Sequence, residues 1–165
     1  MSVDPEHRFG VVERQIGIFT EELSRPKFET ADGEEIVMVS VCLGQTHVTV
    51  ISDEAHRSSQ WTAAFGWSSL TGIAVGAGLP QLTLDEIPRA LRGQLRRYGA
   101  RVRTDGFTEA ARAHMRGAIG AILDQTIGDG AGYDRIVLAA PAWLHEAVSG
   151  CLDLRPHIWS EIQDL

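Results

Sequence analysis

The feature that most constrains this chain is an uninterrupted apolar stretch, residues 136–140 (Ile-Val-Leu-Ala-Ala), which is followed at once by Pro141. A strand without a polar face must be covered by protein on both sides, so we predict an interior strand of a layered sheet. Proline suits the first helical position, because its missing N–H would have no partner there. The sequence therefore predicts a helix over residues 142–149, closed by Gly150, directly at the end of the strand.

A long amphipathic helix is predicted ahead of that strand, because apolar residues recur there three and four positions apart. They are Phe107, Ala110, Ala111, His114 or Met115, Ala118, Ile119, Ile122 and Leu123. Thr108 is the expected N-cap, and the helix should end near Gly128, where several glycines supply positions for a positive φ. A last helix is predicted from Pro156 to the end of the chain. Its apolar residues are Ile158, Trp159, Ile162 and Leu165.

Taken in order, the elements of residues 107–165 resemble the carboxy-terminal half of the bacterial "host attachment" proteins. That family is similar to the central domain of the archaeal and eukaryotic peptide-release-factor and Pelota group. The resemblance is carried by Phe107 and Ala110 in the helix, residues 133–141 in the strand, and Leu152 or Leu154, Ile158, Glu161, Ile162, Asp164 and Leu165 at the end. It implies an RNase H-like α/β layer and a connection to translation, and it implies no catalytic residues.

The chain departs from that family's pattern at two places. The family continues its strand as Ala-Pro-Pro and a basic short helix, whereas this chain reads Pro-Ala-Trp-Leu-His-Glu over residues 141–146. The Gly-Gly-Gln loop of the release factors is also absent, because the string Leu-Gly-Gln-Thr at residues 43–46 holds a single glycine. Peptidyl-tRNA hydrolysis is therefore not expected.

The first third of the chain reads as strands and loops. Alternating side chains predict a strand over residues 10–19, and Pro26 with Asp32-Gly33 predicts a loop over 24–35. Residues 36–43 are an apolar strand, and 46–51 alternate as its half-buried partner, with a two-residue turn at Gly44-Gln45. Antiparallel strands followed by helices predict an α/β or α+β fold with a mixed sheet.

Length and composition set the class of protein. A chain of 165 residues that is 44% hydrophobic predicts one ordinary domain. A net charge of −7 argues against overall attraction to nucleic acid or an anionic membrane. No membrane span or secretory leader is expected, Cys42 and Cys151 should be reduced and buried, and the location should be cytoplasmic.

The middle of the chain combines glycine-rich and basic stretches. Residues 61–78 predict either a strand with a bend or a short packed helix, because glycines argue against a long helix. A helix is predicted from a cap at Thr83 to Arg97 or Tyr98. Its inward residues should be Ile87, Leu91 and Leu95, and Gly99 should end it.

An arginine cluster is the main candidate site for nucleic acid. Six arginines occur between residues 89 and 103 without an acidic residue, namely Arg89, Arg92, Arg96, Arg97, Arg101 and Arg103. The predicted helix puts Arg89, Arg92 and Arg96 on one stripe, and Arg112 and Arg116 repeat the spacing. Since arginine binds phosphate bidentately and stacks on bases, this surface could face RNA. The alternative is a solvated helix face that balances the acidic N-terminal third or pairs with another subunit.

The end of the apolar strand is a second candidate, a pocket for an anion. A helix that opens at Pro141 would present free N–H groups and its dipole there. Asp134, Pro141, Trp143 and His145 are the predicted lining; alternatively, Trp143 simply packs against the sheet. The six histidines include no i, i+4 pair, and no Cys-x-x-Cys occurs, so neither a metal nor a cofactor is predicted.

Three classes of function remain open. The favoured one is a non-catalytic binding domain for RNA or the ribosome. The second is a structural protein that forms homo- or hetero-oligomers, consistent with four tryptophans and no catalytic motif. The third is a small-molecule or phosphoester hydrolase, which needs clustered carboxylates that the sequence does not place at helical spacing.

Overall fold

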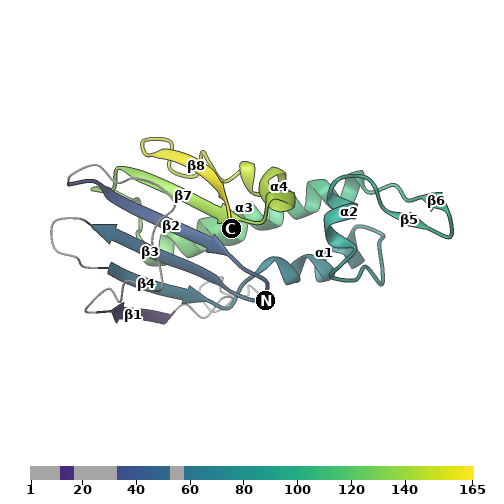
Figure 1. Ribbon diagram of the computed structural model, residues 1–165, viewed down its shortest axis with the longest axis horizontal. Helices are drawn as coiled ribbons and strands as arrows, with labels where there is room; N and C mark the ends of the chain where they lie inside the picture. The colour runs from purple at the N-terminus through teal and green to yellow at the C-terminus, as the bar shows by residue number, and fades with distance from the viewer. Residues whose placement is uncertain (1–11, 17–32, 53–57) are drawn as a thin grey trace, which may run out of the picture.

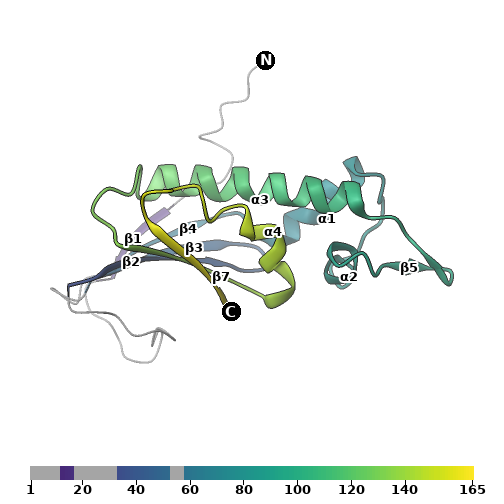
Figure 2. The same cartoon turned by 90° about the horizontal axis from the view of Figure 1, so that it is seen from above.

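A computed structural model describes residues 12–16, 33–52 and 58–165 (Figures 1 and 2). Its main sheet holds six strands in the order β1 (Val12–Ile16), β4 (Ser58–Ala63), β3 (Thr46–Ser52), β2 (Glu35–Val41), β7 (Arg135–Ala140) and β8 (Trp159–Asp164). Neighbours from β1 to β2 are antiparallel, while β2, β7 and β8 are parallel. This mixed sheet with its helices confirms the predicted α/β fold.

The hairpin of β2 and β3 has the predicted faces but a different turn. Val48 and Val50 are buried as expected, and Val39 pairs with Val48. The turn, however, spans residues 42–45, and Gly44 has no positive φ. The next loop explains the difference, because Trp67 N–H donates to the Cys42 carbonyl at 3.0 Å. This tertiary contact, rather than the local turn preference, sets the loop.

The predicted interior strand is confirmed. Residues 136–140 of β7 are all buried, and β7 lies between β2 and β8. Its register places Ile136 beside Val37 and Leu138 beside Val39. Apolar side chains of neighbouring strands therefore meet on one face of the sheet and form the core.

The long helix α3 (Asp105–Thr126) covers that face of the sheet, as Figure 2 shows. Its buried residues are Phe107, Ala111, Met115, Ala118, Ile119, Ile122 and Leu123. The N-cap is Thr104 rather than Thr108, because Thr108 N–H already donates to the Thr104 carbonyl. Gly128, with φ +61°, ends the helix where it was expected. Ala110 and His114 are only half-buried.

The last predicted helix is wrong, because residues from Trp159 onward form strand β8. The apolar spacing fits a helix, yet the segment pairs with the edge of β7 along the whole of that strand, where Ile162 lies beside Leu138. Tertiary context therefore overrides the local preference. The preceding helix is also shorter than predicted. A 3-10 turn, η3 (Ala142–Leu144), leads into α4 (His145–Ser149).

Residues 58–76 contain both of the predicted alternatives, a strand and a short helix. Strand β4 carries Trp61, and η2 (Trp67–Ser69) then leads into α1 (Leu70–Gly76). Gly66 joins them because a Cβ there would lie 2.4 Å from the Leu43 carbonyl oxygen.

The predicted helix of residues 83–98 is the second wrong element. Only α2 (Ile87–Leu91) is α-helical; a small hairpin of β5 (Arg96–Arg97) and β6 (Ala100–Arg101) follows it. Gly93, at φ +64°, ends the helix one turn after Arg89. The views in Figures 1 and 2 place α2 and this hairpin beyond the end of the main sheet. The expected single stripe of arginines therefore does not exist.

The predicted strand of residues 10–19 is present as β1 over Val12–Ile16, and its remaining residues lie outside the described ranges. The predicted loop of residues 24–35 also falls mostly outside them. Within the described part of the chain, no helix has the length and apolar character needed to cross a membrane.

Candidate nucleic-acid interface

The end of the molecule formed by residues 80–105, here called the arginine end, carries all six predicted arginines. Arg89 lies on α2, Arg92 caps it, Arg96 and Arg97 form β5, Arg101 lies on β6, and Arg103 lies in the link to α3. Six arginines against three carboxylates give this segment a net charge of +3, in a chain whose net charge is −7. The arginine end is thus a basic patch on an acidic protein.

Buried aliphatic side chains attach the arginine end to the core. Leu82, Ile87, Leu91 and Leu95 all belong to the hydrophobic core cluster, and Leu95 is 1% exposed. The Val102 N–H donates to the Leu95 carbonyl at 2.9 Å, which closes the base of the β5–β6 hairpin. These contacts attach the base of the hairpin to the core, so its backbone projects from a fixed position.

Arg97 is used inside the protein. Its guanidinium donates to the carbonyls of Pro80 at 3.2 Å and Gln81 at 3.1 Å, and to Glu86 Oε2 at 3.1 Å. The Arg97 hydrogen bond is the main reason that the pKa of Glu86 is lowered. Arg97 therefore ties the hairpin to the loop before α2.

Three arginines behave differently. The side chains of Arg89, Arg92 and Arg96 are exposed, and within the described residues none of them makes a hydrogen bond or an ion pair. Arg89 acts at longer range on Asp85, whose pKa is lowered first by the Thr83 hydroxyl and only weakly by Arg89. Three guanidinium groups are thus free to bind an anion.

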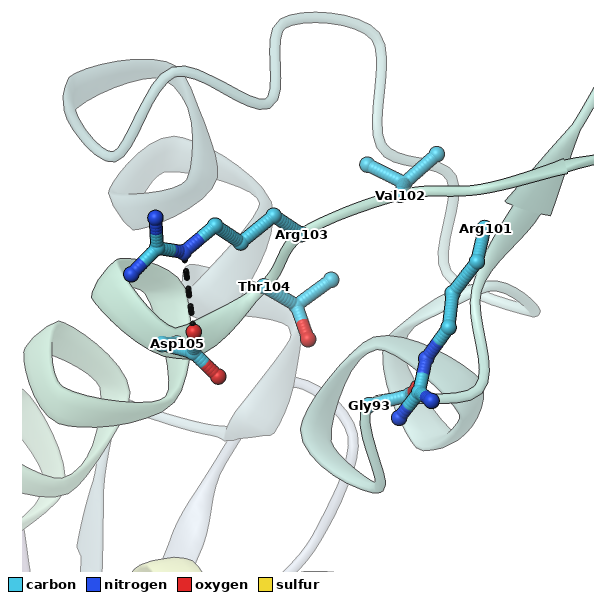
Figure 3. A pocket seen from close by; sticks show the side chains of 6 residues that line it. All are labelled: Gly93, Arg101, Val102, Arg103, Thr104 and Asp105. Carbon is cyan, nitrogen blue, oxygen red and sulfur yellow. Dashed lines mark hydrogen bonds and ion pairs between the residues drawn. The ribbon is translucent and has the colours of Figure 1, made fainter.

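An open cavity of about 330 Å³ lies where the hairpin meets the start of α3 (Figure 3). Its lining is Gly93, Arg101, Val102, Arg103, Thr104 and Asp105. Arg101 Nε donates to the Gly93 carbonyl at 2.9 Å, and Arg103 Nε donates to Asp105 at 3.0 Å. Both bonds use Nε, so the terminal nitrogens of each guanidinium remain available for phosphate oxygens.

A second open cavity, of about 520 Å³, lies beside α2. Its lining is Gln81, Thr83, Asp85, Glu86, Arg89, Arg97 and Tyr98. Tyr98 was not among the predicted site residues, although Gly99 after it, in Arg-Arg-Tyr-Gly-Ala-Arg at residues 96–101, is a residue that favours a tight turn.

The predicted anion pocket at the end of β7 is not assembled. Asp134 precedes β7 and Pro141 follows it, so about 20 Å of strand separates them. The Asp134 carboxylate accepts the Glu35 N–H at 2.9 Å. Asp134 therefore bonds to the first residue of β2, far from the other three predicted residues.

Trp143 and His145 have structural contacts. The Trp143 ring packs edge-to-face on Trp67, with 5.1 Å between ring centroids. His145 Nε2 lies 2.9 Å from the Ala140 carbonyl oxygen. Trp143 is therefore packed, but its ring partner is Trp67 of η2 and not a residue of the sheet, and α4 has only five residues.

Arg112 and Arg116, which repeated the arginine spacing on α3, are also paired. Arg112 Nη2 lies 3.0 Å from the Glu146 carboxylate, and Arg116 bonds the Gly150 carbonyl and the Asp153 carboxylate. Both arginines therefore join α3 to the segment that follows β7 and leave little charge for a ligand.

Other reactive groups are few within the described residues, where no three His, Cys, Asp or Glu side chains lie close enough to hold a metal ion. Both cysteines are free thiols; Cys42 is half-buried and Cys151 is buried. Burial raises the pKa of Cys42, and it raises the pKa of Cys151 to about 12.

Comparisons with known proteins add a likeness of fold. No protein-family model and no curated protein matches the chain. Among solved structures, a non-polymerisable quadruple mutant of pCBH ParM is similar, with a TM-score of 0.57 and 11% sequence identity. The match covers 80% of this chain and 42% of the ParM chain, so this chain spans less than half of that protein. At this identity, the likeness concerns the arrangement of the sheet and helices alone.

Proposed function

We propose that this chain is a non-catalytic binding domain that contacts RNA, in translation or on the ribosome, through its arginine end. The observation that carries the proposal is the division among the arginines. Arg97, Arg112 and Arg116 are used within the fold, whereas Arg89, Arg92 and Arg96 are exposed and have no partner among the described residues.

The chemistry of these side chains fits a phosphate backbone. Guanidinium groups bind phosphate oxygens bidentately, and contacts of this kind supply most of the affinity that does not depend on sequence. The rest of the chain carries a net negative charge, so it does not attract RNA as a whole. Binding should therefore be confined to the arginine end.

The link to translation comes from the resemblance of residues 107–165 to the host attachment and release-factor group. In the structure these residues comprise α3, β7, α4 and β8, and the arginine end leads directly into α3. A role in translation also places the protein in the cytoplasm.

The proposal is tested by changing Arg89, Arg92 and Arg96 together to Gln and measuring binding to a fluorescent single-stranded RNA by anisotropy. We expect an affinity loss of at least about tenfold at low salt. A matched control changes the exposed Ala113, Gln125 and Ala131 to Glu, which lowers the net charge equally, away from the arginine end. Equal losses in the two triple variants would reject a local interface.

A second candidate function, assembly, is favoured by strand β8. Within the described sheet β8 has a strand neighbour only on its β7 side, and Trp159 is 70% exposed on it. An open edge with an exposed aromatic residue can pair with another chain. Sedimentation over a range of protein concentrations tests this: Trp159→Glu should reduce any self-association, and a wild-type monomer at all concentrations excludes it.

A further inference from the structure

The tip of the β5–β6 hairpin carries an unusual residue. Arg97 pairs with Ala100, so Tyr98 and Gly99 form a two-residue turn, with φ values of +51° and +80°. Turns with both central φ values positive favour Asn, Asp and Gly. Gly99 fits this preference, whereas tyrosine at a positive φ is an outlier among non-glycine residues.

The Tyr98 side chain makes no contact that would stabilise the fold. It is fully exposed, with a relative exposure of 107%, so its ring buries no surface against the core. Among the described residues, the Tyr98 side chain makes no hydrogen bond. A residue that neither suits its turn nor packs in the core points to a role in binding.

The surroundings of Tyr98 indicate what it binds. Arg96 and Arg101 face each other across the hairpin and are both exposed, and Arg89 shares the larger cavity with Tyr98. An aromatic ring among guanidinium groups matches the two parts of a nucleotide, since the ring can stack on the base and the arginines can bind the phosphates.

We propose that Tyr98 is a stacking platform for an unpaired base, so that the ligand of the arginine end is single-stranded rather than double-stranded RNA. The inference rests on the proposed function and narrows it. In a duplex the faces of the bases are covered by their neighbours, and only splayed-out bases can stack on an aromatic side chain. Every base has such a face, so the platform tolerates different sequences.

The first test compares three variants of Tyr98 for binding to a single-stranded RNA of about ten nucleotides, a common site size. Tyr98→Phe keeps the ring and should bind as the wild type does. Tyr98→Ala and Tyr98→Asn should each lose about tenfold in affinity. Because Asn suits the positive φ, Tyr98→Asn should keep or raise the melting temperature, which separates binding from folding.

The second test removes the bases instead of the ring, by using an abasic oligonucleotide of the same length. The wild type should bind it about tenfold more weakly than the intact strand, whereas Tyr98→Ala should bind both about equally. The wild type should also bind the intact strand more tightly than a duplex of the same sequence.

Two outcomes would overturn the inference, and they are distinguishable. If the triple Arg→Gln variant loses affinity while Tyr98→Ala and Tyr98→Asn bind like the wild type, the stacking role is wrong and the phosphate-binding surface remains. If the wild type binds neither single-stranded nor double-stranded RNA, both the stacking role of Tyr98 and the proposed function are wrong.

Discussion

The sheet with α3 and the arginine end are built in opposite ways. In the sheet region, a helix of 22 residues covers buried strands, and the arginines that follow α3's first turn are ion-paired, as Arg135 is with Glu34 and Glu161. The arginine end consists of a five-residue helix and two two-residue strands, with exposed arginines that lack partners among the described residues. The contrast shows which charges stabilise the fold and which are left for a ligand.

The largest expected effect tests the core side of this contrast. Leu138→Ala removes a side chain that is 1% exposed at the centre of β7. We expect the free energy of unfolding in urea to fall by about 3 kcal/mol, through lost burial and the remaining cavity. Leu84→Ala, at an exposed leucine of the arginine end, should cost under about 0.5 kcal/mol. Similar losses at both positions would mean that the arginine end is packed like the core.

Two adjacent arginines give the sharpest comparison. Arg97→Gln removes the hydrogen bonds to Pro80, Gln81 and Glu86 and should lower the free energy of unfolding by about 1 kcal/mol. Arg96→Gln makes the same change of charge on an exposed side chain, so it should leave stability unchanged and weaken RNA binding. Urea denaturation and anisotropy measure the two effects. The account fails if Arg96→Gln is the destabilising change.

Alkaline pH should weaken the core through Cys151, whose folded pKa of about 12 is raised by burial. The unfolded thiol ionises near pH 8.5, so the unfolded state binds fewer protons above that pH and stability falls as pH rises toward 12. Relative to a Cys151→Ala variant, which lacks this group, the wild type should lose about 1 kcal/mol between pH 8 and about pH 9.5. Parallel stability curves for the two proteins would contradict the burial of this thiol.

Acid should act on the arginine end through Glu86, and the effect should be the smallest. Its folded pKa is lowered, mainly by Arg97, so its contribution is present above the unfolded carboxyl pKa and is lost as pH falls through the folded value. Glu86→Gln should therefore lower the melting temperature slightly at pH 7, and the difference from the wild type should shrink as the pH falls below the unfolded carboxyl pKa. A difference that stays constant as the pH falls would assign the effect to packing rather than to charge.

The sheet region could be predicted from sequence, because its patterns of apolar residues are long. In the structure the apolar residues of each pattern are buried. The apolar strand of β7, the face of α3 and the alternation of β3 all follow from periodicity. The segment that became β8 could not, since its apolar spacing fits a helix and only the open edge of β7 decides between the two states.

The secondary structure of the arginine end was not predicted, because two local backbone features end the helix early. A positive φ at Gly93 stops the helix early, and Arg96 and Arg97, predicted as its last turn, form a strand that pairs with β6. The arginines were found from composition alone, but their division into paired and exposed groups depends on the fold. The proposed pocket of Asp134 with Trp143 failed because the two residues lie at opposite ends of β7.

The most direct test of the central claim, that exposed arginines without internal partners bind RNA phosphates, is the salt dependence of binding. Each phosphate contact to a single strand contributes about 0.7 to the slope of log affinity against log salt concentration. The change of Arg89, Arg92 and Arg96 to Gln should therefore lower the wild-type slope by about 2. An unchanged slope in this triple variant would contradict the claim, because these arginines would then displace no counterions from RNA.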